Sequence, residues 1–135
     1  MALKQLSGVV GAANRREPFV LNLGRFLTDA LLSRHILPCL QHNLFIFELS
    51  LSHTSLSDSG IMKLSSCLLK DSTLRCLRIA HNRAIRESGF LALAQLLRVH
   101  PALRTLDLSD TNLLSEGREV IHAFPASPQL DELIL

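Results

Sequence analysis

Four copies of one apolar pattern run along the chain, and each copy combines two periods. The copies begin at Ile46, Leu74, Leu103 and Leu130, so their starts are 28, 29 and 27 residues apart. In each complete copy, alternating apolar and polar residues predict a half-buried strand, and apolar residues at helical spacing come next. A fixed repeat of this length is typical of a solenoid, in which neighbouring repeats bury one another's apolar faces.

The repeat has the spacing L-x-x-L-x-L-x-x-N/T-x-L-x-x-x-G-x-x-x-L. Its positions are filled by Ile46, Leu49, Leu51, Thr54, Leu56, Gly60 and Leu64; by Leu74, Leu77, Ile79, Asn82, Ile85, Gly89 and Leu93; by Leu103, Leu106, Leu108, Thr111, Leu113, Gly117 and Ile121; and by Leu130, Leu133 and Leu135. The second copy has one extra residue after its asparagine. We expect the apolar members to share one core.

A polar triplet opens each predicted helix: Asp58-Ser59-Gly60, Glu87-Ser88-Gly89 and Ser115-Glu116-Gly117. Ser and Asp are common helix caps, and acidic residues suit the positive end of a helix. Because glycine recurs at the third place, we expect each helix to approach the neighbouring turn closely there. The Asn/Thr position is expected to bond turn backbone in a ladder, which the two threonines make looser.

The repeat resembles that of leucine-rich repeat proteins, in the long form of ribonuclease inhibitor, the Ran GTPase-activating protein and the NOD-like receptor sensor domains. The resemblance covers residues 44–135 and extends weakly to 18–43, where Phe26 occupies the Asn/Thr position and Leu32 the glycine position. It implies an α/β fold. The expected architecture is a right-handed solenoid in a short horseshoe arc, with a curved parallel sheet on the concave face and helices on the convex face.

The same reasoning divides the chain into three parts. We expect an N-terminal capping helix at residues 1–17, a degenerate first repeat at 18–43, and three repeats plus the strand of a fourth at 44–135. A helix is predicted over 27–41 with a kink or break near His35–Leu37, because Pro38 follows. Pro125 and Pro128 are expected to shorten the helix of the third complete repeat.

Composition narrows the function classes. The chain has 135 residues, enough for one domain, and its net charge of +2 is too small to argue for nucleic acid or an acidic membrane. Cys39, Cys67 and Cys76 have no metal or redox spacing, and no long apolar targeting segment precedes the repeats. We therefore predict a cytoplasmic protein without a cofactor or metal, with nuclear and ciliary locations as alternatives.

The residues between the core leucines are predicted to face outward on the concave sheet surface. Equivalent positions form three columns: Phe19, Phe47, Arg75, Arg104 and Asp131; Asn22, Ser50, Arg78, Asp107 and Ile134; and Arg25, His53, His81 and Asp110. Basic residues gather in the middle and acidic ones toward the C-terminal end. From this surface we predict eight partner-binding residues: Phe47, Arg75, Arg78, His81, Arg104, Asp107, Asp110 and Asp131.

Simpler interpretations of these residues remain open. Arg78–Asp107 and Arg104–Asp131 can be cross-strand ion pairs, which contribute little when exposed. His53 and His81 are expected to be neighbours, and two imidazoles alone make a poor metal site. The aromatic residues Phe19, Phe45 and Phe47 can form a binding patch or pack under the N-terminal helix.

No catalytic arrangement emerges from the sequence, since it contains no phosphate-binding glycine loop, nucleophile elbow or paired carboxylates. We predict a non-enzymatic scaffold for protein–protein interaction, whose partner is another protein and neither nucleic acid nor membrane. Alternatives are a regulator or adaptor of an enzyme, in GTPase activation or ubiquitin-ligase substrate recruitment, and a subunit of a ciliary or cytoskeletal assembly. The C-terminal edge, with Leu133 and Leu135, is expected to be covered by a partner chain or by further sequence.

Overall fold

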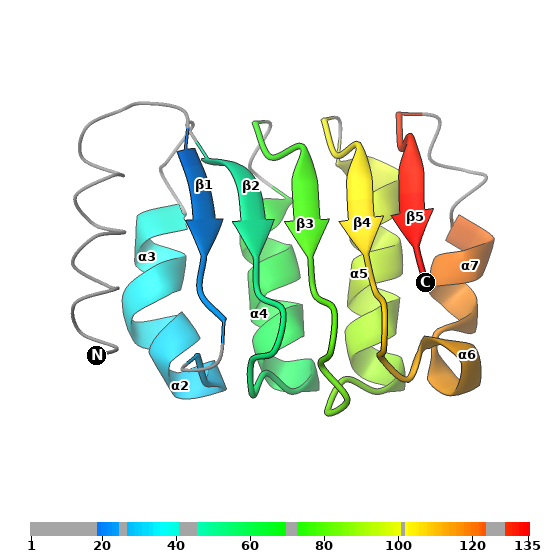
Figure 1. Cartoon of the computed structure of the whole chain (residues 1–135), viewed down its shortest axis with the longest axis horizontal. Coiled ribbons are helices and arrows are strands. Elements are labelled where there is room, and N and C mark those ends of the chain that lie inside the picture. Colours follow the sequence, from blue (N-terminus) through cyan, green and yellow to red (C-terminus); the bar gives the residue numbers. More distant parts are fainter. Residues whose placement is uncertain (1–18, 25–26, 41–45, 70–72, 101, 124–128) are drawn as a thin grey trace.

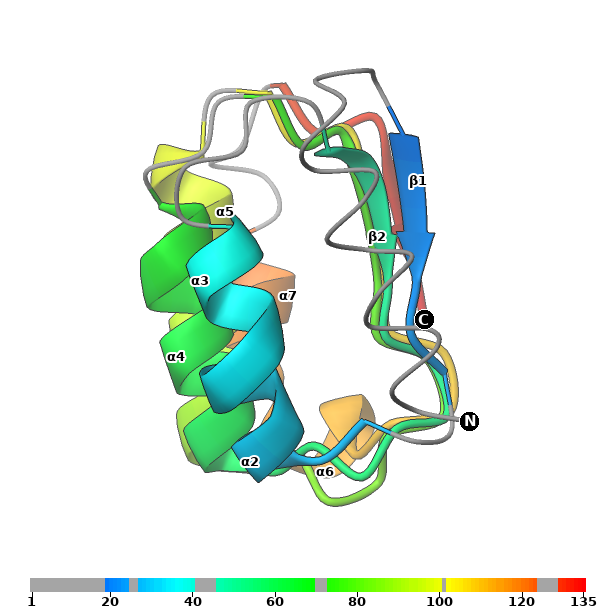
Figure 2. The same cartoon turned by 90° about the vertical axis from the view of Figure 1, so that its left-hand side faces the viewer.

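A parallel sheet forms one layer of the molecule, and helices cover one of its two faces (Figures 1 and 2). The structure is a computed structural model that describes residues 19–24, 27–40, 46–69, 73–100, 102–123 and 129–135. Its five strands lie side by side in sequence order: β1 (Phe19–Asn22), β2 (Ile46–Ser50), β3 (Cys76–Arg78), β4 (Thr105–Asp107) and β5 (Glu132–Ile134).

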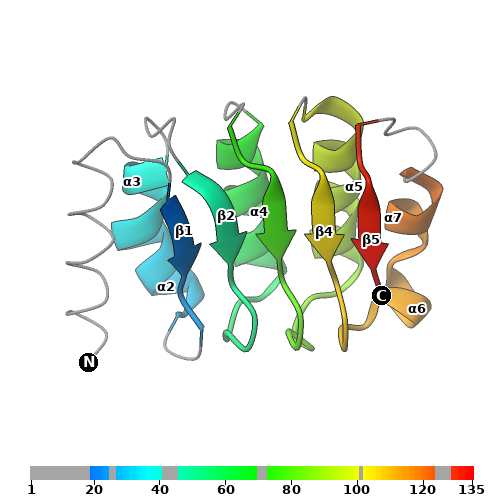
Figure 3. The same ribbon diagram turned by 45° about the horizontal axis from the view of Figure 1, so that its top comes forward.

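Helices connect the strands, so neighbouring strands run parallel. The first connection contains α2 (Asp29–Leu31), the π-helical η1 (Leu32–Ile36) and α3 (Leu37–Leu40). The later ones contain α4 (Asp58–Leu68), α5 (Glu87–Val99), and α6 (Leu113–Glu116) with α7 (Arg118–Ala123). Figure 3 shows the strands in a row with the helices behind them. The architecture is an α/β solenoid.

The core lies between the two layers, and the predicted repeat fills it. Exposure is 1% or less at Ile46, Leu49, Leu51, Leu56, Leu64, Leu74, Leu77, Ile79, Ile85, Leu93, Leu103, Leu106 and Leu108. Burial decreases in the last copy, where Leu130 is buried, Leu133 is partly buried and Leu135 is 59% exposed. The covering of this edge by a partner or by further sequence stays a prediction.

The third complete repeat departs from the predicted pattern at its helix. Ile121, expected in the core, is 43% exposed, whereas Val120 is fully buried. Gly117 directly precedes α7, and its carbonyl accepts bonds from Val120 and Ile121 N–H, but unlike Gly60 and Gly89 it also ends a preceding helix: its N–H bonds Leu113 O of α6 at 2.7 Å. Because α7 begins as a new helix, its residues face the core in a different register, and the buried position is one residue earlier than predicted.

Pro38 does not produce the predicted break, and the alternative, a kink, stays a prediction. The helix continues, but its path widens into the π-helical η1 immediately before α3. Leu37 N–H bonds Leu32 O across five residues, and Pro38 has no N–H to donate. Ser33 O therefore receives no bond from either residue, which leaves this carbonyl outside the regular helical pattern.

The predicted asparagine ladder exists and is centred on Asn82, which is 1% exposed. Its Nδ2 donates to Leu51 O in the preceding repeat at 2.8 Å and to Ile79 O and Ala80 O in its own, while its Oδ1 accepts from Thr54 Oγ1 at 2.7 Å. By contrast, the Thr111 hydroxyl bonds only within its own repeat, to Leu108 O. Of the two threonines, only Thr54 thus bonds across repeats, and in the third repeat the neighbouring Asn112 makes that connection, donating from Nδ2 to Ile85 O at 3.2 Å. The looser ladder that was predicted stays a prediction.

The repeat glycines of α4 and α5 lie against acidic side chains of the preceding repeat. Asp29 accepts a bond from Ser57 N–H at 3.0 Å, and Asp58 accepts one from Arg86 N–H at 2.6 Å, so each acid caps the next helix. An added Cβ at Gly60 would lie 2.1 Å from Asp29 Oδ1. The close approach expected at the helix entry is therefore present in these two repeats.

Several predictions concern residues outside the described part of the chain. They are the capping helix at 1–17, the side chains of Phe19, Arg25, Phe26, Cys39 and Phe45, and the effects of Pro125 and Pro128. Among the helices that the structure describes, none is both long and apolar enough to cross a bilayer.

Candidate interaction surface on the sheet

The surface of interest is the sheet face, by which we mean the side of the sheet that the helices leave open. Strand register places Ser50, Arg78, Asp107 and Ile134 in one column, as predicted. A second column, which the sequence analysis missed, consists of Glu48, Cys76, Thr105 and Glu132. Period-two alternation would have found it, since these residues precede the inward-facing leucines as the first column follows them.

Arg78 is the electrostatic centre of the sheet face. Its Nε lies 2.9 Å from Glu48 Oε1 and its guanidinium 3.7 Å from Asp107 Oδ2. The predicted Arg78–Asp107 pair is thus confirmed, but the shorter contact is the unpredicted one to Glu48. The hydrogen bond that Arg78 donates to Glu48 raises the pKa of Arg78. Flanked on two strands, this arginine is held in place and is not available as a mobile charge.

Cys76 lies beside this ion pair and is 8% exposed. Burial raises the pKa of its thiol, an effect that the neighbouring Arg78 opposes only in part. The thiol therefore stays protonated near neutral pH and is a poor nucleophile. Within the described residues, no group of three His, Cys, Asp or Glu side chains is placed to hold a metal ion.

The predicted column of Phe47, Arg75, Arg104 and Asp131, called the outer column below, is also formed, and backbone bonds link its members. Arg75 N–H bonds Phe47 O at 2.9 Å, Arg104 N–H bonds Arg75 O at 2.8 Å, and the next N–H, of Asp131, bonds Arg104 O. Phe47 is 47% exposed, and the predicted Arg104–Asp131 pair is present at 3.7 Å. Arg75 forms no ion pair with any described residue, so its charge is open to a partner.

His53, His81 and Asp110 lie in a row along the loop edge below the sheet. All three have left-handed backbone, with φ of 58°, 59° and 51°. The imidazole rings stack with centroids 4.1 Å apart, and His81 Nδ1 lies 2.9 Å from Asp110 Oδ2. His and Asp are among the residue types that tolerate this conformation, which by itself accounts for their recurrence here.

Asp110 also accepts two bonds from Arg83, the shorter of 2.6 Å. The bonds from Arg83 and then from His81 lower the pKa of the Asp110 carboxyl. A lowered pKa means that the folded chain binds this proton less tightly than the unfolded chain. The resulting stabilisation is present above the ordinary aspartate range and is lost as the pH falls through the lowered pKa.

Replacing Arg83 with Gln should therefore raise the pKa of Asp110 toward its ordinary value. The measurement is an NMR titration of the side-chain carboxyl carbon of Asp110 in acid. Arg118→Gln, which removes an exposed arginine from α7, is the matched control and should leave the titration unchanged. An unchanged midpoint in Arg83→Gln would show that this ion pair does not form in solution.

Comparison with known proteins agrees with the architecture. Residues 42–65 match the family model described as "Leucine Rich repeat". A similar solved structure is "Leiomodin-1 Actin-Binding Site 2 (ABS2)", at a TM-score of 0.77 and 18% identity, over 94% of this chain and 76% of that chain. No curated protein matches the sequence. The matched repeat and the shared architecture show that this chain has the leucine-rich repeat fold.

Proposed function

We propose that the chain is a non-catalytic protein-interaction module of the long, ribonuclease-inhibitor-like repeat type, and that it binds its partner through the sheet face. The observation that carries this proposal is the outer column of exposed residues, in which Phe47 is 47% exposed and Arg75 has no ion-pair partner among the described residues. An exposed aromatic ring beside an arginine is a common centre of a binding interface. Phe47 lies on β2 and Arg75 immediately precedes β3, so the sheet fixes the positions of both.

The charged residues of the sheet face are distributed unevenly along it. Arg75 lies just before β3, in the middle of the sheet, whereas Asp131 and Glu132 lie at the start of the last strand, and Glu132 makes no ion pair with any described residue. A partner with an acidic and a basic region would fit in only one orientation. Such patterns mainly set specificity and the rate of encounter. We propose Phe47, Arg75, Arg78, His81, Arg104, Asp107, Asp110 and Asp131 as the contact set.

Reversal of Arg75 and Arg104 to Glu tests this proposal. Both side chains are exposed, and the Arg104–Asp131 pair is long, so the stability cost should stay below about 1 kcal/mol. Arg78 is left unchanged, because a glutamate there would lie beside Glu48 and Asp107 and would repel both. We expect the double variant to bind its partner about tenfold more weakly or worse.

Affinity purification with quantitative mass spectrometry provides the measurement, with Arg118→Glu as the charge-matched control on the helix layer. Filamentous actin is tested separately by co-sedimentation, because the similar solved structure is named as an actin-binding site. Partners that the double variant retains at wild-type levels would show that the sheet face is not the contact surface.

A further inference from the structure

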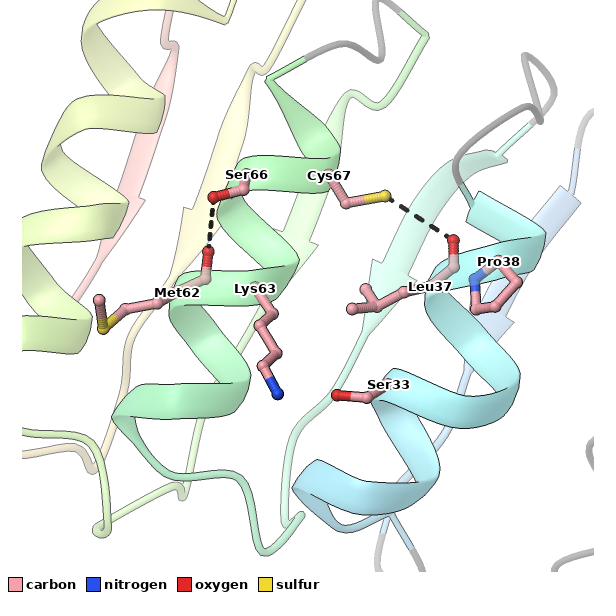
Figure 4. A pocket seen from close by; sticks show the side chains of 7 residues that line it. All are labelled: Ser33, Leu37, Pro38, Met62, Lys63, Ser66 and Cys67. Carbon is pink, nitrogen blue, oxygen red and sulfur yellow. Dashed lines mark hydrogen bonds between the residues drawn. The ribbon is translucent and has the colours of Figure 1, made fainter.

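A second surface lies on the opposite side of the molecule, in the groove between the first helical segment and α4. It has a volume of about 610 Å³ and is lined by Ser33, Leu37, Pro38, Met62, Lys63, Ser66 and Cys67. Figure 4 shows these side chains on the two neighbouring helices, with Ser33 and Lys63 extending into the space between them. This groove is separate from the sheet face, because the core lies between the two surfaces.

The wall of the groove is irregular for a reason that the sequence supplies. Pro38 and the π-helical η1 alter the first helical segment, and α4 packs less closely against it than against α5. Cys67 Sγ lies 3.8 Å from Leu37 O, a long contact across the groove. The Ser33 hydroxyl is buried there and forms no hydrogen bond within the described residues. Isolated π-helical turns are frequent at functional sites.

The lining is apolar with a positive rim. Leu37, Pro38 and Met62 supply apolar surface, and Met62 is 47% exposed. Lys63 lines the groove, and Arg34 follows the lining residue Ser33; both are exposed, and neither forms an ion pair with a described residue.

The acids of the same helices do not compensate these two charges. Asp29 and Asp58 lie in the first turns and accept bonds from the backbone of the next repeat. The charged side chains that the described part of the groove presents to a partner are therefore basic.

We propose that this groove binds an acidic amphipathic helix of a partner protein. Its apolar side chains would enter between the two helical segments, and its carboxylates would meet Lys63 and Arg34. A helix lying in an apolar groove is a common recognition mode, and the positive rim selects an acidic one. The apolar residues line a hollow, which suits an inserted side chain better than a flat lipid surface.

The probe is a fluorescein-labelled peptide of about 14 residues, four helical turns, with leucines on one face and glutamates on the other. Fluorescence polarisation should show binding to the wild-type chain. Lys63→Glu combined with Arg34→Glu should weaken this binding about tenfold or more. Arg118→Glu on α7 and Arg75→Glu on the sheet face are charge-matched controls and should change it less than about twofold. Thermal melts establish that every variant is folded.

A second readout locates the peptide. Alkylation of Cys67, followed by peptide mass spectrometry, should slow when the peptide is bound, while that of the buried Cys76 should not change. Absence of binding, or binding without protection of Cys67, would overturn the proposal. So would Lys63-dependent binding to vesicles of phosphatidylcholine and phosphatidylserine, roughly 3:1, by a chain that ignores the peptide. Loss of sheet-face binding leaves this test unaffected.

Discussion

Replacing Asn82 with Ala should lower the free energy of unfolding by about 2–4 kcal/mol, the largest effect that we expect from a single polar residue. The Asn82 amide donates to carbonyls of two repeats, including Leu51 O at 2.8 Å, and accepts from Thr54. Because the site is closed to water, the truncation removes from Leu51 O, Ile79 O and the Thr54 hydroxyl a bond that cannot be replaced, whereas Ala80 O keeps its bond from His53 N–H. Chemical denaturation measures the loss.

Thr111→Val is the matched control, because it removes one hydroxyl from the same position of the next repeat. That hydroxyl bonds only to Leu108 O within its own turn, so the cost should be about 1 kcal/mol. Equal losses in the two variants would mean that the connection between repeats contributes nothing beyond a local turn. A larger loss for Asn82→Ala measures the coupling between repeats.

Residue spacing was sufficient to predict the strands, the core positions of the first two complete repeats and the columns that contain Arg75, Arg78 and His81, although the column that contains Glu48 was missed. These features depend on the period of two in a strand and on the repeat length, both of which can be read from Leu49, Leu77 and Leu106. The Arg78–Asp107 pair followed from the same register. The Glu48–Arg78 pair did not, because it joins diagonal positions of neighbouring strands and depends on the side-chain rotamer.

The features that spacing missed arise where a local hydrogen bond overrides the repeat. The bond from Gly117 N–H to Leu113 O ends α6, which exposes Ile121 in place of Val120. His100 had no place in the pattern, yet it is fully buried and its Nδ1 accepts bonds from Ala102 and Leu103 N–H at the end of α5. Such caps serve one repeat only, so no periodic signal marks them.

The sheet face and the groove also differ in how far the sequence predicts them. Most of the sheet face could be predicted from the sequence, since each strand has the same pattern as the preceding strand. The groove could not, because it depends on the one helical segment that contains Pro38 and on the π-helical bond from Leu37 to Leu32 O. Binding surfaces of a solenoid can thus lie where the repeat is most regular or where it is interrupted.

Replacing Gly89 with Val should lower the free energy of unfolding by about 1–3 kcal/mol. A Cβ at this position would lie 2.7 Å from both Asp58 Oδ1 and Ile85 Cγ2. The substitution therefore displaces a carboxylate that caps α5 through Arg86 N–H, or a fully buried isoleucine. Valine also adds a β-branched side chain to a helix, which removes the gain that a better helix former would give.

Ser88→Val separates crowding from the loss of helix propensity. Ser88 precedes the glycine in the first turn of α5, but its side chain is exposed, so a valine there should cost less than about 0.5 kcal/mol. Denaturant unfolding of the two variants measures both costs. If Gly89→Val destabilises the chain no more than Ser88→Val does, the glycine is not required for the close approach of α5 to Asp58. A larger loss for Gly89→Val would show that the acid and the glycine of successive repeats pack as one unit, which explains why they recur together at Asp29 and Gly60.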